Sequence, residues 1–200
     1  MKLSRGRIIA IGTLFILLGL CIFSSQYLLN KRDSLFEYIN MQLYFNQMAV
    51  EPDPEPEPVI TEKYIAVLEI PKIDLKKGLY DINSRYNTVS RNVMILSPSN
   101  YPDVDKGNFI LAAHSGNGYL SFFRNLYKLS EGDYAYVYYN NVKYSYEITS
   151  IYYQPKTGTI TVHKPTGKTT LMMITCTKND ESSQTVYVAE LRGTEYAEGY

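Results

Sequence analysis

The sequence contains no tryptophan, only two cysteines, only two histidines and no net charge. Cys21 and Cys176 lie far apart in segments of different kinds, so they are not expected to pair, which excludes a disulfide-stapled scaffold. Two histidines and one cysteine without close spacing make a poor ligand set, so we expect no metal ion and no cofactor. Basic and acidic residues number 20 each and no basic stripe occurs, so nucleic acid is not an expected partner.

Aromatic and β-branched residues are plentiful instead. The 20 tyrosines, together with the β-branched residues of the second half, favour strands over helices in that half. A chain of 200 residues has room for one ordinary domain plus accessory segments. The composition therefore predicts a mostly β domain.

An apolar run near the N-terminus predicts a membrane anchor. Residues 8–29 are almost wholly apolar and uncharged, close to the ~20 residues that a helix needs to cross a bilayer. The run is longer than the ~7–15 residues of a signal-peptide core and no cleavage motif follows it, so an uncleaved anchor is favoured over a signal peptide. Lys2, Arg5 and Arg7 precede the run, whereas Lys31 and Arg32 follow it, so the positive-inside rule favours a cytoplasmic position for residues 1–7 by a small margin. We expect a single-pass protein of the cell membrane with an extracytoplasmic body.

Three further segments can be separated by composition. Residues 30–50 carry apolar side chains at helical spacing and predict a short juxtamembrane helix. Residues 51–63 include "EPDPEPEP", in which alternating prolines favour an extended spacer. The folded domain is expected over residues 64–193, followed by a polar tail at 194–200.

Within the domain, turn residues separate short apolar and aromatic runs. Asn140-Asn141 predicts a hairpin, because asparagine tolerates the positive φ that such turns need. Residues 118–129, "GYLSFFRNLYKL", show a helical apolar period and are the main helix candidate. The fold expected is a small, mostly antiparallel sheet system or barrel with a few short helices. The expected strands are "YIAVLEIPKI", "GNFILAAH", "GDYAYVYYNNVKYSYEITSIYY", "TTLMMITC" and "QTVYVAEL".

Two of these strands end in side chains suited to chemistry. Cys176 ends an apolar strand and His114 ends another, and a polar loop follows each, whereas His163 precedes a proline turn. Taken alone, the cysteine is explained as a small buried hydrophobe and each histidine as a solvated or satisfied ring. Together, Cys176 and His114 predict a dyad, in which the thiolate attacks a carbonyl to form an acyl-enzyme and the imidazole acts as general acid and base.

The segments "LEIPKIDL", "GNFILAAHSGN", "SFFRNLYKLSEGD" and "TTLMMITCT" resemble the sortases, membrane-anchored cysteine transpeptidases of Gram-positive bacteria. The resemblance implies a mostly β fold, an eight-stranded sortase-type β-barrel with short helices behind an N-terminal transmembrane helix. It implies Cys176 as the nucleophile and His114 as the general acid/base. The implied substrate is an LPxTG-like sorting signal of a surface protein or pilin, cleaved before glycine. The implied acceptor is an amine of a peptidoglycan precursor or a pilin lysine.

The resemblance also implies an arginine on the strand after the cysteine, where it binds the substrate carbonyl and the developing oxyanion. At that position the sequence has Gln184. Arg192 lies eight positions further on (192 − 184), about 26 Å along an unbroken strand, so a bulge or another register would have to bring it in. We place Arg192 slightly ahead because the family's chemistry uses arginine, with Gln184 as a neutral substitute and Arg124 as a third candidate.

The branch of the family and the activity leave alternatives. The 62 positions between His114 and Cys176 (176 − 114) leave little room for the inserted helix of class B. Neither a second apolar anchor nor a lid motif is found, which disfavours the usual class C, so a housekeeping, class D-like or atypical pilus-associated enzyme is expected. One alternative function is a weakly active or inactive assembly factor that binds sorting signals. Another is a simple cysteine hydrolase that uses only water as acceptor.

Overall fold

The computed structural model describes residues 13–22, 24, 27, 35, 38–46 and 62–197. The chain divides into two compact units, Met1–Asn40 and Met41–Tyr200. The spacer expected at 51–63 falls almost entirely outside the described residues, as do the cytoplasmic tail at 1–7 and residues 198–200 of the polar tail.

In the first unit, residues 13–22 are helical and expose their large apolar side chains. The anchor expected over 8–29 extends beyond the described residues on both sides. Across the described part of the chain, no helix has both the length and the apolar character needed to span a membrane.

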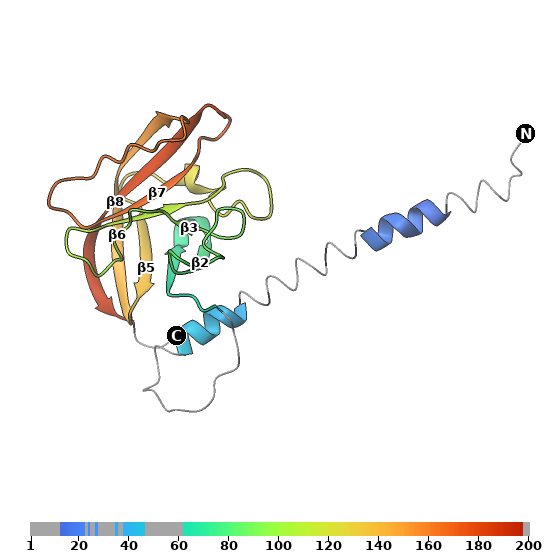
Figure 1. The fold of residues 1–200 in the computed structure, drawn as a ribbon, viewed down its shortest axis with the longest axis horizontal. Coiled ribbons are helices and arrows are strands. Elements are labelled where there is room, and N and C mark those ends of the chain that lie inside the picture. Colours follow the sequence, from blue (N-terminus) through green and yellow to red (C-terminus); the bar gives the residue numbers. More distant parts are fainter. Residues whose placement is uncertain are drawn as a thin grey trace, which may run out of the picture. The chain divides into compact units, whose positions relative to one another are not determined.

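The second unit is built from eight strands in one sheet that curls into a barrel (Figure 1). The strand order is β2-β1-β5-β6-β8-β7-β4-β3, and neighbouring strands pair antiparallel except for the parallel pair β4 and β7. The mostly β fold that the composition predicted and the eight-stranded barrel that the resemblance implied are confirmed. The strands are β1 (Ala66–Ile70), β2 (Leu75–Leu79), β3 (Met94–Ile95), β4 (Asn108–Ala112), β5 (Tyr134–Tyr139), β6 (Val142–Pro155), β7 (Thr170–Cys176) and β8 (Ser183–Tyr196), and the 3-10 helices are η1 (Pro71–Ile73) and η2 (Leu126–Lys128).

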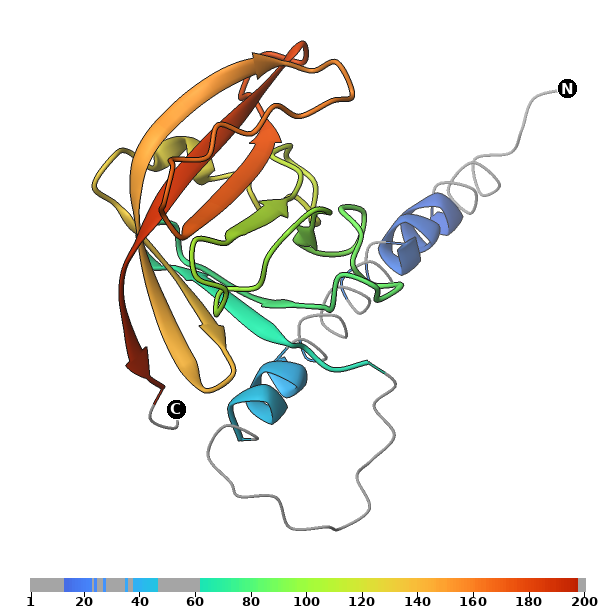
Figure 2. The ribbon, with the colours of Figure 1, turned by 60° about the vertical axis from the view of Figure 1, so that its left-hand side comes forward.

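The predicted hairpin is confirmed at the turn between β5 and β6. Asn140 and Asn141 have φ of 48° and 60°, the left-handed pair that a tight hairpin turn requires. The two long strands β6 and β8 then wrap around the barrel side by side (Figure 2).

The prediction of a helix over residues 118–129 is wrong. The structure has turns there and only the three-residue η2. The buried side chains Phe123, Leu126 and Leu129 are spaced by three residues, which a chain of 3-10 turns satisfies as well as an α-helix does. The backbone bonds from Leu126 to Phe123 and from Leu129 to Leu126 are of this tighter kind.

Strand β7 is buried on both faces. Leu171 and Met173 belong to the main core inside the barrel, while Met172 and Ile174 belong to a smaller apolar cluster on the outer face. A strand covered on both sides reads as a continuous apolar run, as "TLMMIT" does. Its last residue, Cys176, therefore ends one of the most enclosed elements of the fold.

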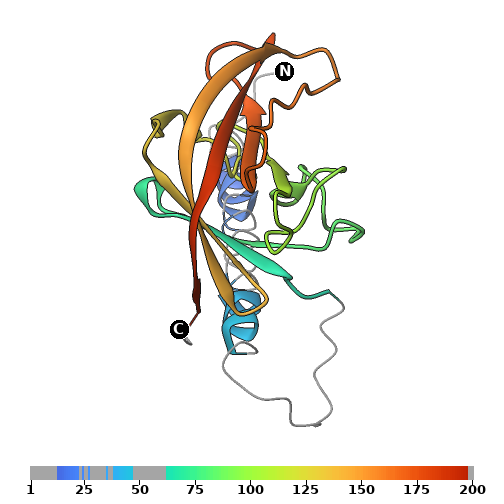
Figure 3. The same cartoon turned by 90° about the vertical axis from the view of Figure 1, so that its left-hand side faces the viewer.

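A third apolar cluster lies near the start of the second unit. Residues 38–46 are helical, in agreement with the part of the predicted juxtamembrane helix that is described. Phe45 packs edge-on against Tyr138, and the Tyr44 hydroxyl donates to the Tyr138 carbonyl at 2.8 Å. Side chains of this helix thereby pack with Val67 of β1 and Tyr138 of β5. Figure 3 shows the ribbon of the helix beside the β5–β6 hairpin.

A buried asparagine holds the irregular segment between β2 and β3. The Asn87 amide donates to the carbonyls of Ile82 and Ile95 at 3.1 and 2.9 Å and accepts from the Ile95 amide at 2.7 Å.

Asn87→Ala would leave the buried Ile95 groups unpaired, so we expect the free energy of unfolding to fall by about 2–4 kcal/mol. Urea denaturation of the full chain in detergent measures this. Ser90→Ala, at an exposed site, should change it by less than about 0.5 kcal/mol. Equal effects of the two variants would contradict the role of Asn87.

Candidate active site

The pairing of β4 and β7 brings Cys176 and His114 to the same edge of the sheet. The two strands run parallel, with Ala112 opposite Ile174, so their carboxyl ends meet. Cys176 is the last residue of β7, and His114 follows the end of β4 by two residues. The expected proximity of the two strand ends therefore arises from a parallel pair within an otherwise antiparallel barrel.

Hydrogen bonds on both sides of His114 hold its backbone against the end of β7. The buried Thr175 hydroxyl donates to the Ala113 carbonyl at 2.7 Å, and the Ser115 hydroxyl donates to the Cys176 carbonyl at 2.7 Å. The Ala113 amide also donates to the Ile174 carbonyl at 3.3 Å. The residues before and after His114 are thus each bonded to the segment that carries the thiol.

The loop that follows His114 is anchored in the core. The Phe123 amide donates to the His114 carbonyl at 3.0 Å, and the Phe123 ring is completely buried. The residues between them, of which 116–120 are exposed, form a short loop with fixed ends. The hydrogen bond from Phe123 holds the His114 backbone at the rim of the barrel, while the imidazole is exposed to solvent.

Cys176 and His114 line one pocket of about 720 Å³. Its wall carries the cations Arg124, Lys156 and Lys178. The Lys178 ammonium lies 3.3 Å from the centroid of the Tyr127 ring, and it lowers the pKa of that phenol by a hydrogen bond and by its charge. The lining residues are His114, Ser115, Gly116, Asn117, Ser121, Arg124, Asn125, Tyr127, Lys156, Cys176, Thr177, Lys178, Asn179, Asp180 and Glu181.

An apolar strip on the outer face of β4, β7 and β8 leads to the thiol. Because side chains alternate along a strand, Met172, Ile174 and Cys176 point to the same face. The buried members of the strip are Ile110, Met172, Ile174, Val186 and Val188.

The loop between β6 and β7 lies over this strip. Ile160 and Val162 pack against it, and the Tyr152 hydroxyl fixes the loop by donating to the Thr161 carbonyl and accepting from the His163 amide, both at 3.2 Å. The second histidine, His163, therefore belongs to this loop: its ring stacks edge-on against Tyr152 and is not among the residues that line the Cys176 pocket.

Gln184 is the residue of β8 that faces Cys176. The two are register partners in the antiparallel pair β7 and β8, so their side chains share a face. On its other side Gln184 pairs with Gln154 of β6. The side-chain oxygen of Gln184 is buried and accepts no hydrogen bond from the described residues. A polar amide without a full set of partners therefore lies next to the nucleophile.

Arg192 is not brought to the pocket. It lies at the bulge where Ser145 opposes Gly193 and Tyr146 opposes Leu191, so a bulge does occur, but near the far end of β8. Its guanidinium bonds Glu147 at 2.6 Å and Glu190 at 3.2 Å, and the hydrogen bond to Glu147 raises the pKa of Arg192. The geometry expected of Arg192 is therefore not found, since its guanidinium pairs with these two carboxylates and Arg192 does not line the Cys176 pocket.

Of the three sequence-predicted cation or amide candidates, the structure places two near Cys176. Arg124 lines the pocket with the thiol, and Gln184 flanks the thiol on the neighbouring strand. The pocket residues Lys156 and Lys178 were not anticipated, because they lie in loops with no pattern that marks a site. Within the described ranges, no group of three or more His, Cys, Asp or Glu side chains could hold a metal ion.

The comparisons with known proteins agree on one family. The sortase domain model matches residues 68–192. A sortase D5 transpeptidase from Clostridium perfringens is 25% identical with a TM-score of 0.55, over 66% of this chain and 80% of the other. Sortase C1 from Streptococcus agalactiae is 24% identical with a TM-score of 0.58, over 65% and 68%. Sortase C-1 from Actinomyces oris is 23% identical with a TM-score of 0.58, over 78% and 82%. No curated protein matches significantly.

The bond from Thr175 to Ala113 yields a testable prediction. Thr175→Val keeps the shape of the side chain but leaves the buried Ala113 carbonyl without this donor, so the free energy of unfolding should fall by about 1–3 kcal/mol. Amide hydrogen exchange around residues 113–116 should also accelerate. Thr159→Val, at an exposed loop position, is the matched control and should leave both quantities almost unchanged. Unchanged exchange in Thr175→Val would show that the bond does not hold the histidine segment.

Proposed function

This chain belongs to the sortase family, and from this membership and the site geometry we propose that it is a cysteine transpeptidase. It cleaves an LPxTG-like sorting signal through an acyl-enzyme on Cys176 and transfers the acyl group to an amine of the cell wall or of a pilin. The observation that carries the proposal is the lateral fixation of His114 beside Cys176 by the hydroxyls of Thr175 and Ser115. A nucleophile and an acid/base held on packed strands have little positional freedom to lose in the reaction.

The proposed reaction has two steps. First, the Cys176 sulfur forms a bond to the scissile carbonyl carbon, the peptide C–N bond breaks, and protonated His114 gives its proton to the departing amine. Second, the acceptor amine attacks the thioester, gives a proton to His114, and the thiolate departs. The number of peptide bonds is unchanged, so no other reactant is consumed.

The apolar strip supports a peptide substrate with apolar side chains. It runs along β7 directly toward Cys176, and Ile160 and Val162 form its cover. An extended segment lying along it would place one side chain of every two against the apolar surface. The sorting signal is therefore proposed to lie along β7, in a position that requires the loop connecting β6 and β7 to move off the strip.

We assign the carbonyl-binding role to Gln184 rather than to Arg192. Its amide nitrogen can donate to the substrate oxygen, and its buried, unpartnered oxygen can accept from a substrate amide. A neutral amide stabilises negative charge less than a guanidinium does, so we expect a slow enzyme. Arg124 lines the pocket with Cys176 and is the alternative source of the charge.

The presence of Gln184, where the resemblance implies an arginine, favours a second candidate function. With glutamine opposite Cys176 in place of an arginine, the protein would be a weakly active or inactive assembly factor that binds sorting signals without efficient transfer.

In either function we propose that residues 8–29 anchor the chain in the cell membrane with the barrel outside, and that the enzyme is class D-like or pilus-associated. Membrane fractionation and protease accessibility of the barrel in intact cells test the location.

Acyl-enzyme formation tests the proposed activity. We expect intact-protein mass spectrometry of the full chain in detergent, incubated with a library of LPxTG-like peptides, to reveal a thioester adduct. Cys176→Ala should form none and His114→Ala should form it at least 100-fold more slowly, whereas Cys21→Ala should behave as the unmodified chain. Added amine should convert the adduct to a transpeptidation product. Release by water alone would indicate a hydrolase, and bound peptide without any adduct would support the assembly factor.

The identity of the carbonyl donor can be determined from four variants. We expect Gln184→Ala to lower the acylation rate by about 100-fold, while Arg192→Ala leaves it within twofold. Gln184→Arg should raise the rate by about tenfold or more, because a charged donor replaces a neutral one. If Arg124→Ala abolishes acylation and Gln184→Ala does not change it, the role belongs to Arg124.

A further inference from the structure

A second pocket lies at the end of the barrel opposite Cys176. It includes Asn140 and Asn141, the turn that leads into β6, whereas Gln154, near the other end of β6, is aligned with Gln184 and Cys176. Gln154 lies twelve positions after Val142 (154 − 142), about 40 Å along the strand. The pocket is therefore not an extension of the candidate active site.

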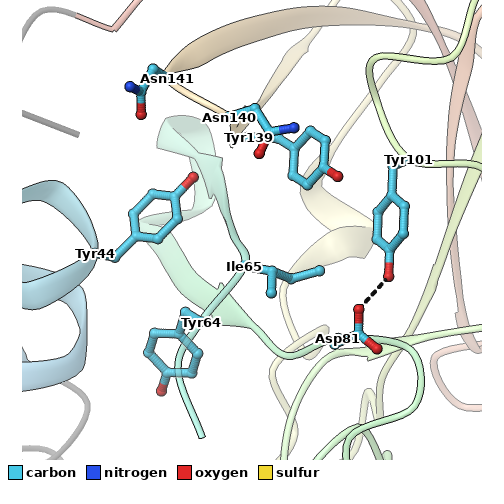
Figure 4. A pocket seen from close by; sticks show the side chains of 8 residues that line it. All are labelled: Tyr44, Tyr64, Ile65, Asp81, Tyr101, Tyr139, Asn140 and Asn141. Carbon is cyan, nitrogen blue, oxygen red and sulfur yellow. Dashed lines mark hydrogen bonds between the residues drawn. The ribbon is translucent and has the colours of Figure 1, made fainter. Parts of the chain in front are cut away.

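Four tyrosines and one carboxylate dominate this pocket of about 290 Å³. Figure 4 shows Tyr44 and Tyr64 on one side and Tyr101 with Asp81 on the other, with Ile65 and Tyr139 between them. The tyrosines come from the helix at 38–46, the segment before β1, the loop before β4 and the end of β5. Four separate parts of the second unit thus converge on one small space.

The carboxylate of Asp81 is held in its charged form. Its oxygens accept from the Asn83 amide at 2.9 Å and from the Tyr101 hydroxyl at 2.8 Å, and these bonds lower the pKa of Asp81. Among the described residues, no lysine, arginine or histidine forms an ion pair with it. The pocket therefore carries a negative charge that the surrounding side chains do not neutralise.

The aromatic walls are neutral and held in place. Burial is the main cause that raises the pKa of Tyr139, and the negative charges of Asp103 and Asp81 add to it. The Tyr139 hydroxyl therefore stays protonated. Tyr101 and Tyr139 stack with centroids 5.3 Å apart and planes 7° apart. The Tyr44 hydroxyl donates to the Tyr138 carbonyl at 2.8 Å. Side chains fixed in this way present a preformed surface rather than one that must be ordered on binding.

Charge and donor chemistry select among possible ligands. An anion would be repelled by Asp81, since no cation lines the pocket. A divalent metal ion would need several carboxylate or carbonyl oxygens, and one carboxylate lines it. A neutral sugar would use the rings and amides but would leave the ionised carboxylate without a counter-charge. An ammonium group is attracted both by the carboxylate and by the faces of tyrosine rings.

We infer that this pocket binds a primary alkylammonium group of the size of a lysine side chain. The carboxylate of Asp81 is the counter-ion, Tyr101 orients it, and the rings of Tyr44 and Tyr139 contact the alkyl stem and the cation. The volume suits such a group, being near the lower end of the ~300–1,000 Å³ of small-molecule pockets.

Binding of small probes to the unmodified full chain in detergent tests the inference without any variant. NMR titration of ring-labelled tyrosine signals should give n-butylammonium a dissociation constant at least tenfold lower than that of 1-butanol, which has a similar shape and no charge. N-acetylglucosamine should bind more weakly than n-butylammonium. Equal binding of amine and alcohol, or preference for the sugar, would overturn the assignment.

Two variants locate the site. Asp81→Asn keeps the shape but removes the charge, so the affinity for n-butylammonium should fall at least tenfold. Tyr101→Phe keeps the ring and leaves Asp81 charged, so binding should persist within about threefold, as a lost neutral hydrogen bond acts only indirectly. Glu131→Gln, an exposed carboxylate outside the pocket, is the control and should leave the affinity unchanged. If Glu131→Gln lowered the affinity for n-butylammonium as much as Asp81→Asn does, the binding would be only a non-specific attraction to negative charge.

The source of the ammonium group is resolved by two further probes. A peptide with one internal lysine competing better than n-butylammonium indicates a protein side chain as the natural ligand, whereas better competition by cadaverine indicates a free small amine. The site is independent of the proposed reaction, so Cys176→Ala should bind these probes unchanged. Asp81→Asn should still form the Cys176 adduct at the normal rate. If one substitution abolished both the binding of the probes and the formation of the Cys176 adduct, the two sites would not be separate.

Discussion

The parallel pairing of β4 with β7 is the constraint on which the candidate site depends. Every other neighbour in the sheet is antiparallel, so this is the one place where two strand ends of the same polarity lie side by side. The hydroxyls of Thr175 and Ser115 then join the two ends beyond the last backbone ladder bonds. Cys176 and His114 remain neighbours without contacting each other, because these hydrogen bonds join the two segments that carry them.

The electrostatic character of the site differs from what a guanidinium opposite the thiol would create. Gln184 offers one neutral donor and one buried acceptor beside Cys176, and the positive charge of the pocket comes instead from loop residues such as Arg124 and Lys178. Charges on loops are more exposed and better screened than charges on packed strands. In the proposed reaction, this arrangement would stabilise an oxyanion less than a guanidinium opposite the thiol would.

The two ends of the barrel present different chemistry. At one end the thiol and the imidazole line a solvent-open pocket together with three cationic side chains and the carboxylates of Asp180 and Glu181. At the other end Asp81 lies among tyrosine rings without a paired cation in the described part of the chain. The long strands β6 and β8 join these ends, so a ligand at the tyrosine pocket would contact the hairpin that begins β6. Two sites on one rigid barrel can bind two groups of the same large substrate at once.

The sequence by itself determined the mostly β fold, the Asn140-Asn141 hairpin and the strand end at Cys176, because these follow from β-branched and aromatic composition, from turn chemistry and from the change of an apolar run into a polar loop. It misread residues 118–129, since an apolar spacing of three suits 3-10 turns as well as an α-helix. Only the tertiary structure decided that Gln184 faces Cys176 while Arg192 pairs with glutamates. Register and bulges depend on how distant strands pair, and no local pattern encodes that pairing.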